Sequence, residues 1–571
     1  MLQQVKYKSM LDDNKQVRRI IRLLSRRIEE KTGLRLYESD DRNADIIIGL
    51  SPDIKAEGYR ITDGDQGQII VYGGSNLGVL YGLGKLLRDA DYDEGFFQPG
   101  NWRGISEPDG EVRGIYLATH KHNFYHDAPV SAVEEYIEDL TIWGFNAILV
   151  WFDMHHYTAI TDPEALDMSE RLKRIFQSSQ ELGLKTGFLV VANEAYKNSP
   201  VELRADWTSG HDGYVETLAS HYHNELCPRK HGSIKLLKEM RKEFLDVFSE
   251  TQPDYLCFFP YDEGGCTCSD RKPWGANGYL KAVEALAGMV KNDLPKTKIV
   301  LGTWFFDRFT TGEWKGLDER FRESTGYADY IMADSYMRFG LFPDYPIKHG
   351  VPGNLPMINF TDISMYGGAA PWGGYGTNPH PAHLQEHWDV CGDYVTGGFP
   401  YSEGIFEDMN KAVVGCLYWN RKTTTHHAIQ EYIKFEYSRV FVNEILKIVN
   451  IYEDTLHRQR TVKDKEGNQR YKIIRTKGID EAYDAVKDID SKLQESVRKS
   501  WRWRIFFLRA VIDYEMKKDH FTMTSQVNEQ AFQELTEIYY AQRAEFNVAP
   551  PTKKARKRAK GQLKQYYKGE N

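Results

Sequence analysis

Two adjacent carboxylates, Asp262 and Glu263, stand where an apolar, aromatic stretch of the chain stops and two glycines follow. The stretch 254–261 is typical of a buried strand. A strand that ends in carboxylates suits catalysis, because the sheet fixes the side chains while the loop beyond admits substrate. Like charges held close together raise the pKa of one group, so such a pair supplies an acid and a base near neutral pH. An ordinary strand-to-loop turn is the alternative.

The elements that must position this pair form a repeating pattern. Helical patterns separate a series of short apolar runs. The runs lie at 112–118, 146–152, 185–191, 255–261, 298–304, 329–333, 355–360 and 394–399. Eight buried strands with helical crossovers predict an α/β fold, a (β/α)8 TIM barrel, with the carboxylate pair after strand 4. A doubly wound sheet with extra strands is the alternative.

Four segments are expected along the chain. Residues 1–105 predict a small α/β domain, with a helix at 16–32, a strand at 44–50, a hairpin at 57–72 and a helix after an N-cap at Ser75. Residues 106–420 form the barrel, and 421–548 a helical domain with helices at 428–454, 479–498, 501–518 and 526–546. Residues 549–571 are a basic tail, which indicates a solvated, flexible terminus or, alternatively, a nuclear-import or nucleic-acid patch.

Composition and charge argue against several classes of protein. The net charge is 74 − 82 = −8, which argues against nucleic acid as the main partner. The sequence contains no run of about 18 apolar residues, so no membrane span is predicted. The first residues lack the apolar core of a secretory signal. We therefore expect a cytoplasmic protein. Six cysteines are too few for a disulfide scaffold in 571 residues.

The predicted strand ends are rich in carboxylate, amide, Tyr and Trp side chains. Carboxylates accept paired hydrogen bonds from hydroxyl groups, and aromatic faces stack on the apolar face of a pyranose, so the pattern favours a sugar substrate. The expected substrate-binding residues are His120, Lys121, Asn193, Trp304, Asp334, Tyr336, Trp372, Tyr401 and Glu403. We therefore expect an oligosaccharide or glycoside as the substrate, without a cofactor or a catalytic metal. We also expect that a homodimer could form through the helical domain.

Glycoside cleavage needs an acid for the leaving oxygen and a second group at the anomeric carbon. Neighbouring residues at a strand end point in different directions, so Asp262 and Glu263 do not suit an opposed acid and nucleophile. They suit a substrate-assisted scheme, in which Glu263 is the general acid/base and Asp262 orients an N-acetyl group that attacks C1.

The chain resembles the family 20 glycoside hydrolases (β-N-acetylhexosaminidases) in its layout and in short motifs. Asp262-Glu263 stands where that family keeps its acetamido-orienting Asp and its acid Glu. Tyr336 resembles the family's acetamido-binding Tyr, and Tyr401-Ser-Glu403 resembles its strand-8 Trp-x-Glu. The resemblance implies an exo-acting, retaining glycosidase. The chain departs from the family at 258–261, where Phe-Phe-Pro-Tyr replaces His-x-Gly-Gly, and after strand 1, where a sugar-binding Arg is not evident.

Two other functions remain open. The layout also resembles the family 67 α-glucuronidases, which implies an inverting glycosidase with Glu263 as acid and Glu403 or Asp362 as base. A non-catalytic carbohydrate-binding protein on the same barrel is the second alternative.

Thiols and histidines raise the question of a metal. Cys227, Cys266 and Cys268 could assemble a thiolate zinc site or could be plain loop thiols. The histidines at 120, 122, 155 and 156 show no established metal-binding spacing and are expected to be surface or sugar-binding residues.

Overall fold

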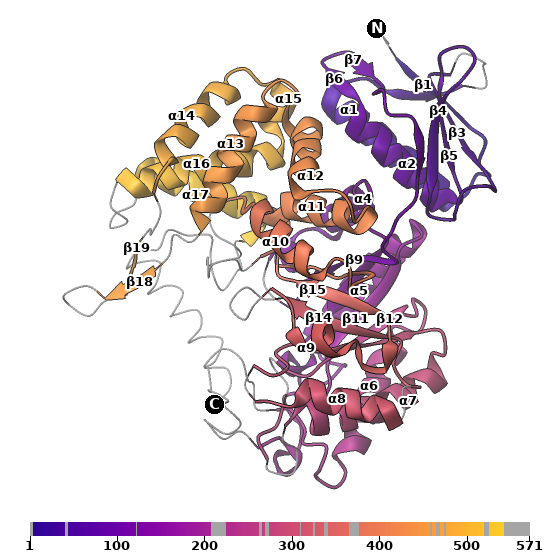
Figure 1. Ribbon diagram of the computed structural model, residues 1–571, viewed down its shortest axis with the longest axis vertical. Coiled ribbons are helices and arrows are strands. Elements are labelled where there is room, and N and C mark those ends of the chain that lie inside the picture. Colours follow the sequence, from indigo (N-terminus) through magenta and orange to yellow (C-terminus); the bar gives the residue numbers. More distant parts are fainter. Residues whose placement is uncertain are drawn as a thin grey trace.

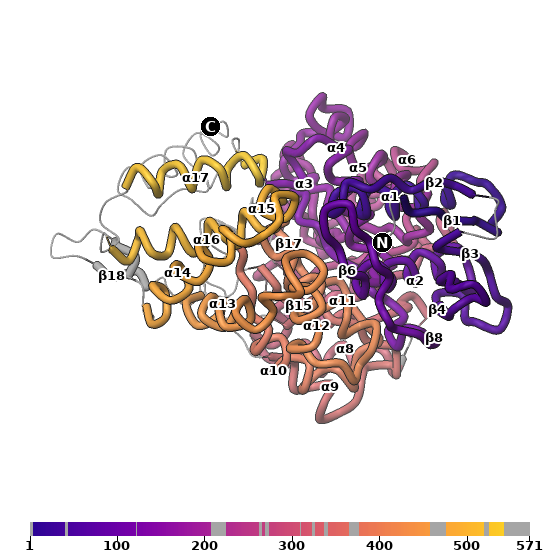
Figure 2. Tube along the Cα trace, turned by 90° about the horizontal axis from the view of Figure 1, so that it is seen from above, coloured from indigo at the N-terminus to yellow at the C-terminus, as the bar shows by residue number. Residues whose placement is uncertain are grey.

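The computed structural model describes residues 4–39, 44–120, 123–206, 224–261, 265–268, 273–308, 310–323, 326–335, 341–364, 376–456, 460–463, 469–472, 476–518 and 525–541. An N-terminal sheet with two helices and a group of C-terminal helices both lie above a central barrel (Figure 1). From above, these two groups lie on opposite sides of the picture (Figure 2). Among the described residues, no helix has the length and apolarity needed to cross a membrane.

The N-terminal part is one mixed sheet with two long helices. The sheet order is β2-β1-β3-β5-β4-β8, with β1 Val5–Ser9, β2 Leu36–Glu38, β3 Ile46–Leu50, β4 Tyr59–Asp63, β5 Ile69–Gly73 and β8 Gly104–Ser106. The antiparallel pair β4–β5 confirms the predicted hairpin. The helices are α1 (Lys15–Thr32) and α2 (Asn76–Asp89), and the strands β6 (Asp91–Asp93) and β7 (Phe96–Gln98) pair beside them.

Helix α2 begins at the predicted Ser75 cap, whose side chain accepts a hydrogen bond from the backbone N–H of Gly78. Its glycines allow close packing on the sheet. A Cβ on Gly78 would lie 2.3 Å from the carbonyl oxygen of Gly58, and one on Gly82 would lie 2.6 Å from Val71. These glycines therefore serve helix packing.

The predicted barrel is confirmed. Its parallel order is β10-β11-β12-β13-β14-β15-β16-β9, and pairing between β10 and β9 closes the sheet. The strands are β9 Val112–Leu117, β10 Ala147–Trp151, β11 Lys185–Val191, β12 Tyr255–Phe259, β13 Lys298–Gly302, β14 Tyr330–Ser335, β15 Met357–Thr361 and β16 Gly397–Gly398. The eighth position continues as β17 (Tyr401–Ser402), which pairs with β9 beyond Pro400. All eight predicted runs contribute a strand.

Large side chains fill the barrel. Alternate residues of its strands form one buried cluster that includes Tyr116, Trp151, Phe259 and Phe360. Period-two alternation sends these rings inward while the intervening residues meet the surrounding helices. The interior is thus packed, so a site must lie at one end of the barrel.

Helices follow the barrel strands. The longer ones are α4 Val130–Thr141, α5 Pro163–Glu181, α6 Ser233–Val247, α7 Leu280–Asp293, α8 Glu313–Glu323, α10 Pro381–Cys391 and α11 Asp408–Trp419. Short helical turns are α3 Phe124–Asp127, η1 Met154–His156, η2 Val201–Leu203, η5 Gly275–Tyr279, α9 Asp344–His349, η6 Pro352–Asn354 and η8 Ile405–Glu407.

The C-terminal part is helical as expected, but the predicted helices at 428–454 and 479–498 are each broken. The first forms α12 Thr425–Tyr432, the wider turn η9 Ile433–Tyr437 and α13 Val442–Asp454. Then follow the antiparallel pair β18 Arg460–Lys463 and β19 Gln469–Lys472, and the helices α14 Ile479–Asp490, α15 Glu495–Lys499, α16 Trp501–Lys518 and α17 Gln526–Ile538. The second predicted helix is thus divided into α14 and α15. The basic tail lies outside the described residues.

A buried ionic network joins the three parts. Arg27 of α1 donates to both carboxylate oxygens of Glu436 in η9, at 2.6 and 2.8 Å. Arg502 of α16 donates to Asp408 of α11 at 2.7 Å and to Asp139 of α4 at 2.8 Å. The side chains of all five are at most 8% exposed. Loss of one partner would leave a buried charge uncompensated, so the network couples the packing of the three parts.

We predict that Arg502→Met lowers the free energy of unfolding by about 3–5 kcal/mol, because the buried carboxylate of Asp408 loses the cation paired with it, and Asp139 keeps its pairs with Arg26 and Arg27 but loses Arg502. Arg504→Met is the matched control on the same helix, since the side chains of Arg504 and its partner Glu534 are 26% and 37% exposed; it should cost about 1 kcal/mol or less. Urea unfolding followed by tryptophan fluorescence measures both. Equal losses in the two variants would contradict a coupling role for the network.

Candidate active site

The predicted catalytic pair, Asp262 and Glu263, lies outside the described residues, as do Lys121, Tyr336 and Trp372. The remaining predicted residues are described, and all follow strands at the carboxyl end of the barrel: His120 after β9, Asn193 after β11, Trp304 after β13, Asp334 at the end of β14, and Tyr401 and Glu403 at the eighth position. This end carries the chemistry in barrel enzymes.

The described residues that flank the pair in the chain, Tyr261 and Gly265, are held by hydrogen bonds. Before it, the hydroxyl of Tyr261 donates to Glu313 at 2.6 Å. After it, Gly265 forms two hydrogen bonds with the side-chain amide of Asn193: its N–H donates at 3.0 Å and its carbonyl oxygen accepts at 2.8 Å. The same amide donates to the carbonyl oxygen of Leu226 at 3.0 Å. Asn193 thus holds the backbone of Gly265 and Leu226 from the end of the neighbouring strand β11.

Glu313 anchors Tyr261, which precedes the pair in the chain. Its carboxyl group also accepts from the backbone N–H groups of Gly275 at 2.6 Å and Asp307 at 2.9 Å. Burial raises its pKa to about 7. Sequence reasoning did not single out Glu313, because its partners come from three separate segments.

Aromatic rings connect several of the predicted residues. Trp304 contacts Phe360 at 5.6 Å between ring centroids, Phe360 contacts Tyr401 at 5.7 Å, and Tyr401 stacks on Tyr116 at 5.5 Å. The hydroxyl of Tyr116 is hydrogen-bonded to Nδ1 of His120 at 3.0 Å. His120, Trp304 and Tyr401 therefore lie along one aromatic layer, which we call the aromatic floor: His120, Tyr116, Tyr401, Phe360 and Trp304.

The ends of β13 and β14, the fifth and sixth barrel strands, carry two residues with strained backbone and one buried acid. Phe305 and Asp307 have φ of 62° and 58°, a left-handed conformation that costs energy for residues other than glycine and recurs at functional sites. The N–H of Phe305 donates to Asp334 at 3.4 Å. Burial raises the pKa of Asp334 to about 6.

At strand eight, Tyr401 donates to Glu403 at 2.6 Å. Behind this pair lies Glu407, whose carboxyl group accepts from the N–H of Glu403 at 2.7 Å and from the hydroxyl of Ser364. Burial raises the pKa of Glu407 to about 7. The sequence predicted Glu403 as a site residue but did not single out Glu407, four positions further along the chain.

A second acidic group lies after β10 and β11. Glu194 is fully buried and accepts from Nε1 of Trp151 at 3.2 Å, and it is hydrogen-bonded to Nδ1 of His155 at 2.6 Å. Burial raises the pKa of Glu194 to about 7 and lowers that of His155 well below its ordinary value. His156 pairs with Asp153. These two histidines are mostly buried and paired, so the expected surface position is wrong for them, and the sugar-binding role stays a prediction.

Within the part of the chain that the structure describes, two groups of side chains could hold a metal ion. Asp153, His155 and His156 offer ligand atoms within 4.8 Å of one another, and so do Cys227, Cys266 and Cys268. In the first group the Nδ1 atoms of both histidines already face carboxylates, as described above. In the second group the three sulfurs face one another.

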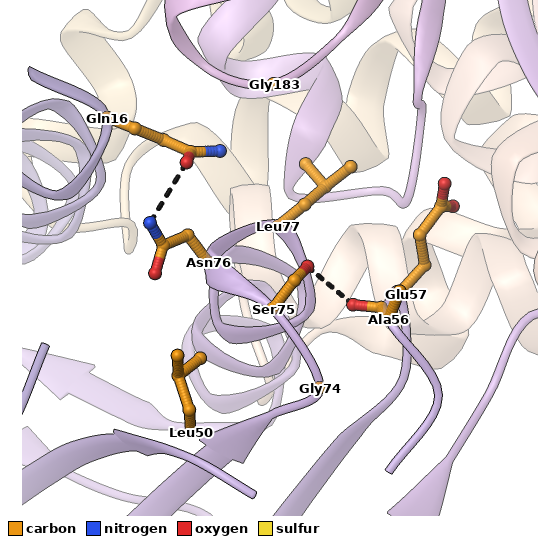
Figure 3. A pocket seen from close by; sticks show the side chains of 9 residues that line it. All are labelled: Gln16, Leu50, Ala56, Glu57, Gly74, Ser75, Asn76, Leu77 and Gly183. Atoms are coloured by element: carbon orange, nitrogen blue, oxygen red, sulfur yellow. Dashed lines mark hydrogen bonds between the residues drawn. The ribbon is translucent and has the colours of Figure 1, made fainter. Parts of the chain in front are cut away.

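A cleft of about 560 Å³ lies elsewhere, at the start of α2 (Figure 3). Gly183 borders it just before β11, so it adjoins the amino end of the barrel, away from the predicted site. The hydroxyl of Ser75 donates to the carbonyl oxygen of Ala56 at 2.6 Å, and the side chain of Asn76 donates to Gln16 at 3.0 Å. These polar groups serve local structure, and the cleft does not contribute to the site.

Comparison with known proteins supports the fold. No protein-family model and no curated protein sequence matches the chain. Solved structures do match it. A family 115 4-O-methyl-α-glucuronidase with specificity for decorated arabinogalactans aligns with a TM-score of 0.60 at 12% identity, over 97% of this chain and 79% of that one.

Two further matches have the same architecture. A family 89 protein from Clostridium perfringens, solved with GlcNAc-α-1,4-galactose, aligns with a TM-score of 0.60 at 13% identity, over 92% of this chain and 64% of that one. A family 20 chitobiase from Flavobacterium johnsoniae aligns with a TM-score of 0.52 at 14% identity, over 99% of this chain and 90% of that one. The barrel is thus one that glycoside hydrolases of several families share, which confirms the predicted fold.

We predict that Glu194→Gln changes how stability depends on pH. The pKa of Glu194 is raised on folding, so the native state holds its proton more tightly than the unfolded chain does. Its contribution to stability is complete below its unfolded pKa and is lost as pH rises through about 7. The wild type should therefore lose about 3 kcal/mol of unfolding free energy relative to the variant between pH 5 and 8, at about 1.4 kcal/mol per unit of pKa shift.

Urea unfolding at several pH values measures this difference, with the exposed Glu202→Gln as a matched control. A difference between the wild type and Glu194→Gln that stays constant across this range would contradict a buried carboxyl group with a raised pKa at this position.

Proposed function

We propose that the protein is an exo-acting glycoside hydrolase that acts on a 2-acetamido sugar with retention of configuration. The observation that carries the proposal is the pair of anchors that flank the two carboxylates in the chain: Tyr261 donates to Glu313 before them, and Gly265 exchanges hydrogen bonds with Asn193 after them. A catalytic acid must be held in position, because a misplaced acid loses most of its effect, and anchors at this strand end support such a role.

In the proposed reaction, Glu263 donates its proton to the glycosidic oxygen as the bond from that oxygen to C1 breaks. The carbonyl oxygen of the substrate's own acetamido group attacks C1 from the opposite face, and Asp262 orients this group and stabilises the charge on its nitrogen. Glu263 then removes a proton from water, which opens the cyclic intermediate. The two displacements at C1 together retain the anomeric configuration.

The described residues would bind the sugar. The rings of Trp304 and Tyr401 belong to the aromatic floor and suit the apolar face of a pyranose. The carboxylate of Glu403, held by the hydroxyl of Tyr401, would accept hydrogen bonds from sugar hydroxyl groups. Asp334 and His120 supply further polar contacts from β14 and β9.

An inverting glycosidase is the second candidate, and the buried carboxyl groups of Asp362 and Glu403 favour it, because either could act as the base with Glu263 as the acid. Inverting pairs lie about 6.5–9.5 Å apart, to leave room for a water molecule, whereas retaining pairs lie about 5–5.5 Å apart. The α-glucuronidase with the same fold supports this candidate. The anomer released first, observed by NMR, distinguishes it from the retaining scheme.

A panel of nitrophenyl glycosides tests the substrate class. Matched pairs with a 2-acetamido or a 2-hydroxyl group should show turnover only for the 2-acetamido member, because only that group can attack C1. Turnover of glucuronides or of the 2-hydroxyl members would contradict the substrate-assisted mechanism. No turnover of any member by wild-type protein, together with measurable sugar binding, would favour the non-catalytic carbohydrate-binding alternative.

We predict that Glu263→Gln reduces kcat by about 10²–10⁴-fold on substrates with poor leaving groups, because it removes the general acid. The loss should be much smaller on a dinitrophenyl glycoside, whose leaving group needs no proton, and substrate binding should be preserved. Steady-state kinetics on both substrate types measure the contrast, with the exposed Glu239→Gln as a matched control. Near-normal turnover by Glu263→Gln of the substrate with a poor leaving group would contradict the assignment of Glu263 as the general acid.

A further inference from the structure

We propose that Cys227, Cys266 and Cys268 form a zinc site that links the loop after β11 to the loop after β12. Their sulfur atoms lie within 4.8 Å of one another, although the first cysteine is about forty residues from the others in sequence. The site is separate from the groups proposed to contact the sugar, and the inference does not depend on the proposed reaction.

The distance between sulfurs fits a shared metal ion. The Sγ atoms of Cys227 and Cys268 are 3.8 Å apart. Two thiolates bound at ~2.3 Å to one tetrahedral zinc ion lie ~3.8 Å from each other. A disulfide needs a separation of about 2.05 Å, so the observed spacing suits metal coordination rather than a covalent bond.

Backbone donors surround the sulfur atoms. The backbone N–H groups of Arg229 and Lys230 are hydrogen-bonded to the thiol of Cys227. The backbone N–H of Asp206 donates to Sγ of Cys266 at 3.4 Å. Donors of this kind orient the sulfur ligands of a metal and stabilise their negative charge.

The ligand set selects zinc among common divalent ions. Thiolates are soft ligands that bind zinc well and bind magnesium or calcium poorly. Three sulfurs leave the fourth tetrahedral position for a nitrogen or oxygen ligand. Cys268 is partly exposed, which gives the ion access to the site.

The site lies beside the backbone that Asn193 holds. Cys227 directly follows Leu226, and Cys266 directly follows Gly265; both Leu226 and Gly265 accept hydrogen bonds from the amide of Asn193. Zinc would therefore connect the same two loops a second time. The ion would position the loop that carries Asp262 and Glu263 without touching substrate.

We predict about one zinc ion per chain after incubation with zinc sulfate and removal of free metal, measured by plasma mass spectrometry. Cys227→Ser and Cys266→Ser should bind zinc at least about tenfold more weakly than the wild type. Loss of a hydrogen bond to a metal ligand already lowers metal affinity by about 10–100-fold, and loss of the ligand itself should cost more. Cys391→Ser is the matched control, since this buried cysteine lies at the end of α10, outside the cluster.

X-ray absorption of the wild-type protein gives a second readout that does not depend on the folding of a variant. It should show three sulfur neighbours at about 2.3 Å. Stoichiometric zinc with fewer than two sulfur ligands, zinc binding by Cys227→Ser equal to that of the wild type, or a wild-type protein that binds no zinc when its thiols are reduced would each overturn the inference. Because the readout is bound metal, its failure would leave the proposed glycosidase activity standing.

Discussion

The buried contact between Arg502 and two carboxylates, Asp408 and Asp139, is the interaction on which the arrangement of the parts depends. It joins a C-terminal helix to two helices of the barrel, and the adjoining pair of Arg27 and Glu436 extends the connection to α1. Buried charges of this kind add little net stability compared with apolar packing, but any arrangement that separates them is strongly disfavoured. The network therefore selects one mutual packing of the three parts.

The same network reaches the carboxyl end of the barrel. Tyr136 donates to Asp408 at 2.8 Å and accepts from Lys411 at 2.8 Å. Lys411 also donates to the carbonyl oxygen of Gly404 at 2.6 Å, next to Glu403. Burial lowers the pKa of Lys411 to about 8, which shows how fully this amine is removed from water. The helical part thus supports the backbone of the strand-eight end as well as covering the barrel.

The strands could be predicted from the sequence because each is a short apolar run that the barrel buries on both sides. Residues that point from a strand end, such as Trp304 and Tyr401, could be found in the same way, since their place in the strand count sets their place in space. The supporting groups could not. Asn193 and Gly265 lie 72 positions apart. Glu313 begins α8 and Glu407 directly precedes α11, and a glutamate at a helix start is common for reasons unrelated to a site. Only the fold brings these residues to their partners.

These supporting carboxyl groups also determine how pH would act on the protein. Glu194, Glu313 and Glu407 each have a pKa raised to about 7 by burial, and each accepts backbone N–H groups near the strand ends. Ionisation of any one of them places a charge in a poorly solvated position and alters the loop that it holds. A change in activity near neutral pH would therefore report the positioning groups together with the general acid. Because titrations of this kind overlap, the pH profile of the wild type alone would not identify Glu263, and its assignment depends on the contrast between leaving groups.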